Sequence, residues 1–203
     1  GTNLVINGDF ENGSTGVPSD YIPGTGGSWG LLAKPGQYAV STSPNLVHNN
    51  FYFCGDHTTG TGNMYIANGS DLANTIVWQQ TITVVPNTNY NFSAWATSVE
   101  NTTDHAFLQF FVNNVQIGAV FSPTNTGCNW TQFFNLWNSG VATSSTISIK
   151  NQNISQGGND FALDDISFRS YCTNYDTIVV SYDPTTLDIG PDISFCDYAT
   201  ETI

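Results

Sequence analysis

The chain has 203 residues, of which only 9% are charged, and 16 acidic residues against three Lys and Arg give a formal net charge of −13. Binding to a nucleic-acid backbone or an anionic membrane surface requires clustered Lys and Arg, so this composition excludes both kinds of partner. Hydrophobic residues make up 39% of the chain and aromatic residues 13%, which is enough apolar material for a packed core and argues against intrinsic disorder. No apolar run approaches the ~20 residues of a membrane span.

Short segments that alternate apolar and polar residues, separated by turn signals, run from the N-terminus to about residue 170. Asn3–Phe10 comes first. A long stretch rich in Gly, Pro and Ser follows, 13–53, which we expect to be functional or packed by its own side chains. The pair Asn113-Asn114 is typical of a hairpin turn, because asparagine tolerates a left-handed backbone. The remaining predicted segments are Asn63–Ala67, Ile76–Val85, Asn89–Ser98, Ala106–Gln116, Trp130–Trp137, Thr146–Asn151 and Phe161–Phe168.

These segments, with no helical interval between them, predict an all-β fold over residues 1–172: a jelly-roll β-sandwich of two antiparallel sheets. The residue pattern of the sequence changes after residue 172. We therefore expect residues 173–203 to be a connector and the beginning of a following module. No basic region followed by an apolar stretch precedes Gly1, so we expect any signal peptide to have been removed already.

The four cysteines, Cys54, Cys128, Cys172 and Cys196, are predicted to form disulfides. None belongs to a Cys-x-x-Cys motif, and no histidine lies at zinc-ligand spacing from them. Four cysteines allow three connectivities. We favour Cys54 with Cys128, since both lie in loops of the same predicted domain. Cys172 then pairs with Cys196, unless Cys196 has its partner beyond residue 203.

Three segments carry a family resemblance: Asn3–Gly13 (NLVINGDFENG), Cys54–Tyr65 (CGDHTTGTGNMY) and Asn159–Phe168 (NDFALDDISF). Together they resemble the galactose-binding-like jelly rolls, which include carbohydrate-binding modules of the family 4/9/22 type and MAM adhesion domains. The chain is most similar to N-terminal modules of large surface proteins of Bacteroidota, over nearly all 203 residues. Leu187–Cys196 resembles the start of the PKD/Ig-like repeats that follow in such proteins.

The resemblance implies a structural Ca²⁺ where the first and last strands meet the loop before a middle strand. The residues support it, because Asp164 lies in an apolar strand of a chain with almost no cations, and Ca²⁺ takes carboxylate and carbonyl oxygens. The alternative is that Asp164 accepts hydrogen bonds from backbone N–H groups and that Glu11 is solvated. Since side chains alternate along a strand, we expect Asp165 to point to the opposite face. The expected ligands are Glu11, Asp164, Asp56 and, through backbone carbonyls, Asp9 and Met64.

Five Trp, nine Tyr and thirteen Phe make the chain rich in aromatic rings. Sugars bind by stacking their apolar faces on such rings, while amides and carboxylates take the hydroxyl groups. We expect most of the rings to lie in the core or to pack loops onto the sandwich. Alternation in Asn89–Ser98 puts Phe92 on the core face and Trp95 on the outer face. The candidates for a sugar platform, on the concave face or in the loops at the end of the sandwich, are Trp29, Trp78 and Trp95.

The sequence contains no Gly-x-Ser-x-Gly and no His-Glu-x-x-His, and its three histidines are isolated. We interpret His57 as a loop histidine that packs on a strand edge, and the nearby Cys54 as a disulfide partner rather than a nucleophile. Asp160, Asp164 and Asp165 are clustered, as the two carboxylates of a glycosidase would be. The resemblance assigns that stretch to a structural strand, so we expect no enzyme activity.

Asp176-Thr177-Ile178 resembles the Asp-Thr/Ser-apolar signal for periplasmic O-glycosylation in Bacteroidota, which makes Thr177 a candidate modification site. The expected protein is the N-terminal module of a secreted, multidomain bacterial cell-surface adhesin that binds polysaccharide or another cell or abiotic surface. A gliding-motility adhesin exported by the type IX pathway is the most specific form of this hypothesis. The alternatives are an ancillary carbohydrate-binding module of a polysaccharide-degrading enzyme and a purely structural module that contacts other domains.

Overall fold

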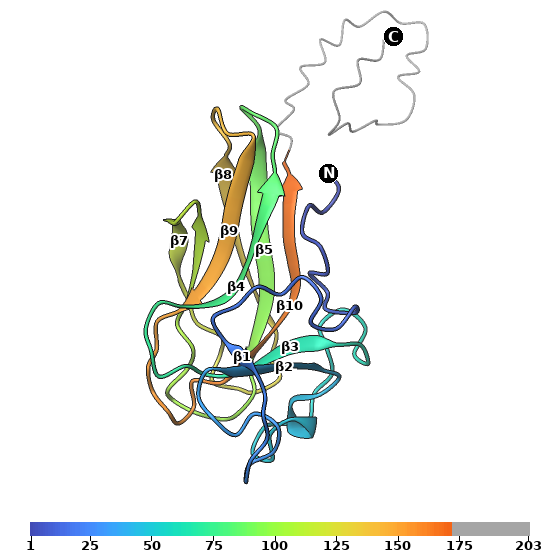
Figure 1. Ribbon diagram of the computed structural model, residues 1–203, viewed down its shortest axis with the longest axis vertical. Helices are drawn as coiled ribbons and strands as arrows, with labels where there is room; N and C mark the ends of the chain where they lie inside the picture. The colour runs from blue at the N-terminus through green and yellow to red at the C-terminus, as the bar shows by residue number, and fades with distance from the viewer. Residues whose placement is uncertain (172–203) are drawn as a thin grey trace, which may run out of the picture.

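The computed structural model describes residues 1–171; the expectations for Cys172, Thr177, Cys196 and the module 173–203 lie outside the described residues. Two sheets form a β-sandwich (Figure 1). Among residues 1–171, no helix is both long and apolar enough to cross a membrane. The six-stranded sheet has the order β1 (Ile22–Pro23), β2 (Gln37–Ser41), β3 (Met64–Asn68), β10 (Phe161–Ser170), β5 (Asn89–Ser98) and β8 (Thr131–Asn138). The four-stranded sheet has the order β4 (Thr75–Thr83), β9 (Ser144–Asn151), β6 (Leu108–Val112) and β7 (Val115–Phe121).

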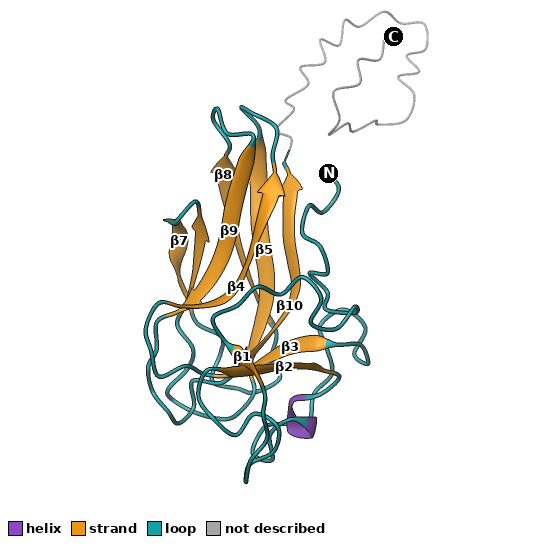
Figure 2. Ribbon diagram, viewed as in Figure 1, coloured by secondary structure: helices purple, strands orange, loops and turns teal. Residues whose placement is uncertain are grey.

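Neighbouring strands are antiparallel except for the short pair β1–β2, and the predicted jelly-roll sandwich is confirmed. The turn between β6 and β7 is the predicted one: Asn113 and Asn114 have φ of 51° and 62°, the left-handed pair that a two-residue hairpin needs. The only helical element of the described residues is the short 3-10 turn Pro44–Leu46. Figure 2 shows loops gathered around β1, β2 and β3 at one end of the sandwich.

The opening segment is not the regular strand that its alternation predicts. Asn7 and Phe10 both have φ of 56°, and a left-handed residue interrupts the extended backbone of a strand. The segment nevertheless runs beside β10, because the Leu4 N–H donates to the Phe168 carbonyl (2.9 Å) and the Ile166 N–H donates to the Gly8 carbonyl (2.8 Å). The first and last segments of the sandwich are therefore neighbours, as expected.

The absence of a side chain at Gly8 allows the opening segment to approach β10 this closely. A Cβ at position 8 would lie against the backbone carbonyl oxygen of Ile166, far inside van der Waals contact. We expect Gly8→Ala to lower the free energy of unfolding by about 2 kcal/mol, because the two backbones must separate to admit the methyl group. Denaturant unfolding measures it, with Gly157→Ala as the control, since a Cβ there meets nothing within 4 Å. Equal stability of the two variants would contradict the close approach.

The core lies between the two sheets and is rich in aromatic rings. The Phe110 and Phe133 rings stack with their centroids 3.5 Å apart, and Phe92 packs edge-on against both. A second, smaller cluster includes Leu32, Phe51 and Met64 and packs against Trp130. The long stretch 13–53 is thus packed by its own side chains, which is one of the two outcomes expected for it.

Candidate functional site

The outer face of the six-stranded sheet carries a set of polar and aromatic side chains on β10, β5 and β8. Phe92 and Ala94 of β5 belong to the core between the sheets, so the alternate residues Ser93 and Trp95 face outward. Residues directly paired across an antiparallel ladder point to the same face. The register pairs Trp95 with Gln132 and Ser93 with Phe134 of β8, and it pairs Ser93 with Ser167 of β10.

These outward residues form the floor of a groove with a volume of about 390 Å³. Ser93, Trp95 and Gln132 line it from the sheet, and Asn3 and Asn7 line it from the opening segment beside β10. The opening segment is therefore one wall of the groove. A volume of this size lies at the lower end of the range for small-ligand sites, which is ≈ 300–1,000 Å³.

Three side chains on the groove floor, Ser93, Trp95 and Gln132, carry polar groups that face the groove. Among residues 1–171, the indole N–H of Trp95, the hydroxyl of Ser93 and the side-chain amide of Gln132 take part in no intramolecular hydrogen bond. Ser93 is buried and Trp95 is half-buried. Free donors and acceptors beside an aromatic ring are the groups that a hydroxylated ligand requires.

His57 fixes the Trp95 ring. The imidazole stacks on the indole with the ring centroids 3.8 Å apart and the planes 16° from parallel. Its Nδ1 lies 2.7 Å from the Asp165 carboxylate. The Trp130 ring packs edge-on against the imidazole, with the ring centroids 5.9 Å apart. His57 is a loop histidine, as predicted, but it packs on the outer face of the interior strand β5 rather than on a strand edge, and its contacts with Trp95 and Asp165 were not predicted.

Asp165 does not point away from Asp164, and that expectation is wrong. The ladder between β10 and β5 has an irregularity between Asp164 and Ser167, and Asp165 has a φ of 49°. Such a bulge breaks the alternation of side chains. Both carboxylates consequently face the same loop: Asp164 Oδ2 accepts the backbone N–H of His57 (2.9 Å), and Asp165 Oδ1 accepts the Thr58 hydroxyl (2.8 Å).

The environment of Asp164 is unfavourable for a negative charge. Burial raises the pKa of Asp164 to about 7, and the neighbouring Asp165 carboxylate adds to the rise. The N–H groups of Asp165, His57 and Thr58 oppose the rise by donating hydrogen bonds to the carboxylate. Hydrogen bonding of Asp164 to backbone N–H groups is the alternative that the sequence left open.

Two other expected calcium ligands, Glu11 and Asp56, accept hydrogen bonds from backbone N–H groups of the same loop. Glu11 Oε1 accepts the N–H of Asn63 (2.8 Å), and Asp56 accepts the N–H groups of Thr59 and Gly62 (both 2.7 Å). Burial alone would raise the pKa of Asp56, but these hydrogen bonds outweigh burial and hold it below its usual value.

The side-chain oxygens are of the kind that Ca²⁺ takes. Among residues 1–171, however, no three or more acidic, His or Cys side chains gather into a metal-binding group. Asp9 accepts the Glu11 N–H, and the Met64 side chain is buried in the smaller cluster. The calcium site stays a prediction.

The structure separates the three candidate tryptophans. Trp95 lines the groove, whereas Trp29 is 53% exposed in a loop, with its ring 6.3 Å from that of His48. Trp78 is fully buried in the core, so its assignment to a sugar platform is wrong. An irregularity between Ile76 and Trp78 in β4 places Val77 and Trp78 both in the core, which alternation could not reveal.

Cys54 and Cys128 form a disulfide, which confirms the favoured pairing. It links the loop that carries His57 to the chain just before β8.

Comparison with known proteins gives no matching family model and no matching curated protein. Several solved structures are similar. β-1,4-Galactotriose-bound TmCBM61 has a TM-score of 0.51 and 14% identity over 84% of this chain and 100% of that chain. The N-terminal tandem of CBM22 domains from Paenibacillus barcinonensis Xyn10C has a TM-score of 0.52 and 14% identity, over 84% of this chain and 46% of that one. The arabinose-bound α-L-arabinofuranosidase MgGH51 has a TM-score of 0.56 and 12% identity, over 83% of this chain and 26% of that one. The chain has the jelly-roll fold that such carbohydrate-binding modules share, as the resemblance implied.

Proposed function

We propose that the protein is a non-catalytic carbohydrate-binding module and that a polysaccharide segment binds in the groove on the outer face of the six-stranded sheet. The observation that carries the proposal is the set of unpaired polar groups beside the Trp95 ring on the groove floor. The solved structures that share the fold include a galactotriose-bound module, and they support the ligand class by analogy only.

The groove suits a sugar chain for physical reasons. His57 covers one face of the Trp95 ring and holds the ring in place, so little side-chain entropy is lost when a sugar contacts the rest of it. Ser93 and Gln132 offer neutral donors and acceptors to hydroxyl groups, and Asn3 and Asn7 border them. Residues at alternate positions of a strand lie ~7 Å apart, so a row of outward side chains can contact successive sugar units.

The test compares the wild-type protein with Trp95→Ala on a glycan array and in pull-downs on insoluble polysaccharides. We expect the wild-type protein to bind at least one neutral polysaccharide, and Trp95→Ala to weaken that binding roughly thirtyfold, equivalent to about 2 kcal/mol for a central aromatic contact. Gln116→Ala is the control, because Gln116 is exposed on β7 of the other sheet. A wild-type protein that binds no polysaccharide would favour a purely structural module.

We place this module in a secreted, cell-surface adhesin, with a gliding-motility adhesin of Bacteroidota as the most specific form. The disulfide and the resemblance to surface proteins support an extracellular setting. The alternative is an ancillary module of a polysaccharide-degrading enzyme. The parent gene separates the two, since repeated PKD/Ig-like domains after residue 203 indicate an adhesin and a hydrolase domain indicates an enzyme.

A further inference from the structure

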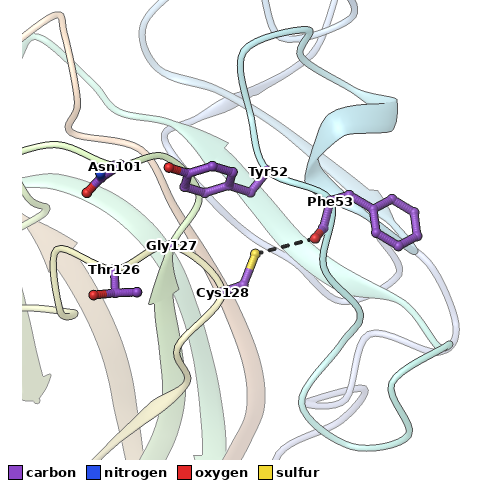
Figure 3. Close-up of a pocket in the computed structure, with 6 residues that line it drawn as sticks. All are labelled: Tyr52, Phe53, Asn101, Thr126, Gly127 and Cys128. Carbon is purple, nitrogen blue, oxygen red and sulfur yellow. Dashed lines mark hydrogen bonds between the residues drawn. The ribbon is translucent and has the colours of Figure 1, made fainter.

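A second pocket lies beside the disulfide and shares no lining residue with the groove. It has a volume of about 390 Å³ and is lined by Tyr52, Phe53, Asn101, Thr126, Gly127 and Cys128 (Figure 3). Its walls come from the segment before Cys54, the turn after β5 and the segment before β8. The proposed function does not use this pocket.

The pocket is held rigidly by the backbone around it. The Cys54–Cys128 disulfide joins two of its walls. The N–H of Tyr52 donates to the Val99 carbonyl (2.8 Å), and the N–H of Cys128 donates to the Ser98 carbonyl (3.0 Å). Both walls are thus attached to the end of β5. A ligand that enters the pocket meets a preformed surface and loses little free energy in ordering it.

Tyr52 provides an aromatic surface with one side supported. Its ring lies against Gly127, where a Cβ would collide with the ring atoms Cδ2 and Cε2. Tyr52 is 41% exposed, so part of its ring is open to solvent while Gly127 supports the rest. Figure 3 shows the hydroxyl end of Tyr52 directed toward Asn101 and the Phe53 ring directed away from the other side chains.

The side-chain polar groups of the pocket are neutral. Among residues 1–171, the Tyr52 hydroxyl, the Asn101 side-chain amide and the Thr126 hydroxyl have no intramolecular hydrogen-bond partner. None of the lining residues carries a charge, although the chain has a net charge of −13. The Cys128 sulfur lies 3.7 Å from the Phe53 carbonyl oxygen, but a disulfide sulfur has no hydrogen to donate, so this contact satisfies neither group.

We propose that this pocket is a second carbohydrate site, which takes a single neutral sugar unit stacked on Tyr52 with its hydroxyl groups bonded to Asn101 and Thr126. The lining offers no charged partner to a uronic acid or an amino sugar, so the pocket contains no group that would favour a charged sugar over a neutral one. The site is independent of the groove. A polysaccharide that reaches both sites would bind with the gain in avidity of a linked pair.

The experiment is a two-dimensional NMR titration of the ¹⁵N-labelled protein with each of four free sugars: D-galactose, D-glucose, D-xylose and L-arabinose. We expect at least one sugar to produce saturable shifts of the Asn101 side-chain amide and the Gly127 backbone N–H. In Tyr52→Ala these shifts should need roughly tenfold more sugar or vanish. Tyr171→Ala is the matched control, because Tyr171 is 46% exposed and does not line the pocket.

A second variant guards against a folding artefact. Gly127→Ala keeps the Tyr52 ring but displaces it from its support, so it should weaken the same shifts. The groove is followed in the same spectra through the Trp95 indole N–H and the Gln132 amide. If the pocket responds and the groove does not, the second site stands, and the groove is then tested separately by the polysaccharide binding of Trp95→Ala. If none of the four sugars shifts Asn101 and Gly127, or if the shifts persist unchanged in Tyr52→Ala, the second site is overturned.

Discussion

Replacing Asp164 by asparagine should remove about 4 kcal/mol of the fall in the free energy of unfolding that the wild-type protein undergoes between about pH 4 and pH 7 in EDTA. The pKa of Asp164 is raised from 3.8 to about 7, chiefly by burial. A carboxyl group with a raised pKa in the folded state favours folding while it is protonated. Its contribution is complete below about pH 4 and is lost as the pH rises through about 7. Asparagine is neutral throughout, so the variant lacks this dependence.

Two other carboxyl groups shape the same pH profile. Burial, reinforced by the neighbouring Glu100, raises the pKa of Asp160 well above its usual value, so some loss of stability with rising pH should persist in Asp164→Asn. Asp56 acts in the opposite direction, because its pKa is lowered and its contribution is lost only as the pH falls below about 4. Urea unfolding at a series of pH values measures the profile. Asp71→Asn, at an exposed position, is the control, and parallel profiles for Asp164→Asn and the wild-type protein would contradict the account.

The same titration with calcium in place of EDTA tests the calcium prediction. A ligand that binds only the folded state stabilises it by mass action. If calcium binds through Asp164 and Glu11, the wild-type protein becomes more stable near neutral pH when calcium is added, and Asp164→Asn does not. If calcium changes the stability of neither protein, the carboxylates rely on the N–H groups of the 56–63 loop, and the calcium prediction is wrong.

Removing the Cys54–Cys128 disulfide should lower the free energy of unfolding by about 4 kcal/mol. The bond closes a loop with a sequence separation of 74 residues, and a cross-link of that span restricts the unfolded chain strongly. The double variant Cys54→Ser, Cys128→Ser isolates the effect, measured by denaturant unfolding. It should also disrupt the second carbohydrate pocket, since both walls depend on the bond, and leave the Trp95 groove intact.

A matched pair of substitutions controls for the loss of thiols. Cys172→Ser with Cys196→Ser removes the other two cysteines of the chain. We expect the free energy of unfolding of the domain formed by residues 1–171 to fall far more in the 54/128 variant than in this control. A loss below about 1 kcal/mol in the 54/128 variant would show that the disulfide adds little to the loop closure already provided by the sheet.

Regular strands were predictable where the alternation of apolar and polar residues agreed with the turn residues on either side. Asn89–Ser98 has apolar residues at every second position from Tyr90 to Ala96, and it coincides with β5. The hairpin at Asn113-Asn114 was predictable because few residue types adopt a left-handed backbone at two successive positions. The adjacency of the opening segment and β10 came from the family resemblance rather than from alternation, and the structure confirms it.

Irregular backbone accounts for the failures. The bulge after Asp164 turned Asp165 toward the 57–58 loop, and the irregularity before Trp78 placed that ring in the core. A single inserted or left-handed residue reverses the face of the side chains that follow it in the strand. In β10 the spacing of three between the core residues Leu163 and Ile166 marks this change, but no residue pattern marks it before Trp78 in β4. The positive φ of Phe10 was equally unmarked, since a bulky residue seldom adopts it.

The groove itself could be predicted only in part. Alternation correctly placed Trp95 on the outer face of its strand. The pairing of Trp95 with Gln132, the stacking of His57 on the indole and the wall formed by Asn3 and Asn7 all join residues far apart in the chain. Such contacts depend on the order of strands in the sheet, which a single sequence does not contain.

The most direct test of the central claim is isothermal titration calorimetry with the polysaccharide that binds best on the glycan array. The measurement compares the wild-type protein, Trp95→Ala and Trp29→Ala. We predict that Trp95→Ala weakens binding roughly thirtyfold and that Trp29→Ala, whose ring lies outside the groove, leaves the affinity unchanged. Equal affinity of Trp95→Ala and the wild-type protein would contradict the assignment of the groove as the carbohydrate-binding surface.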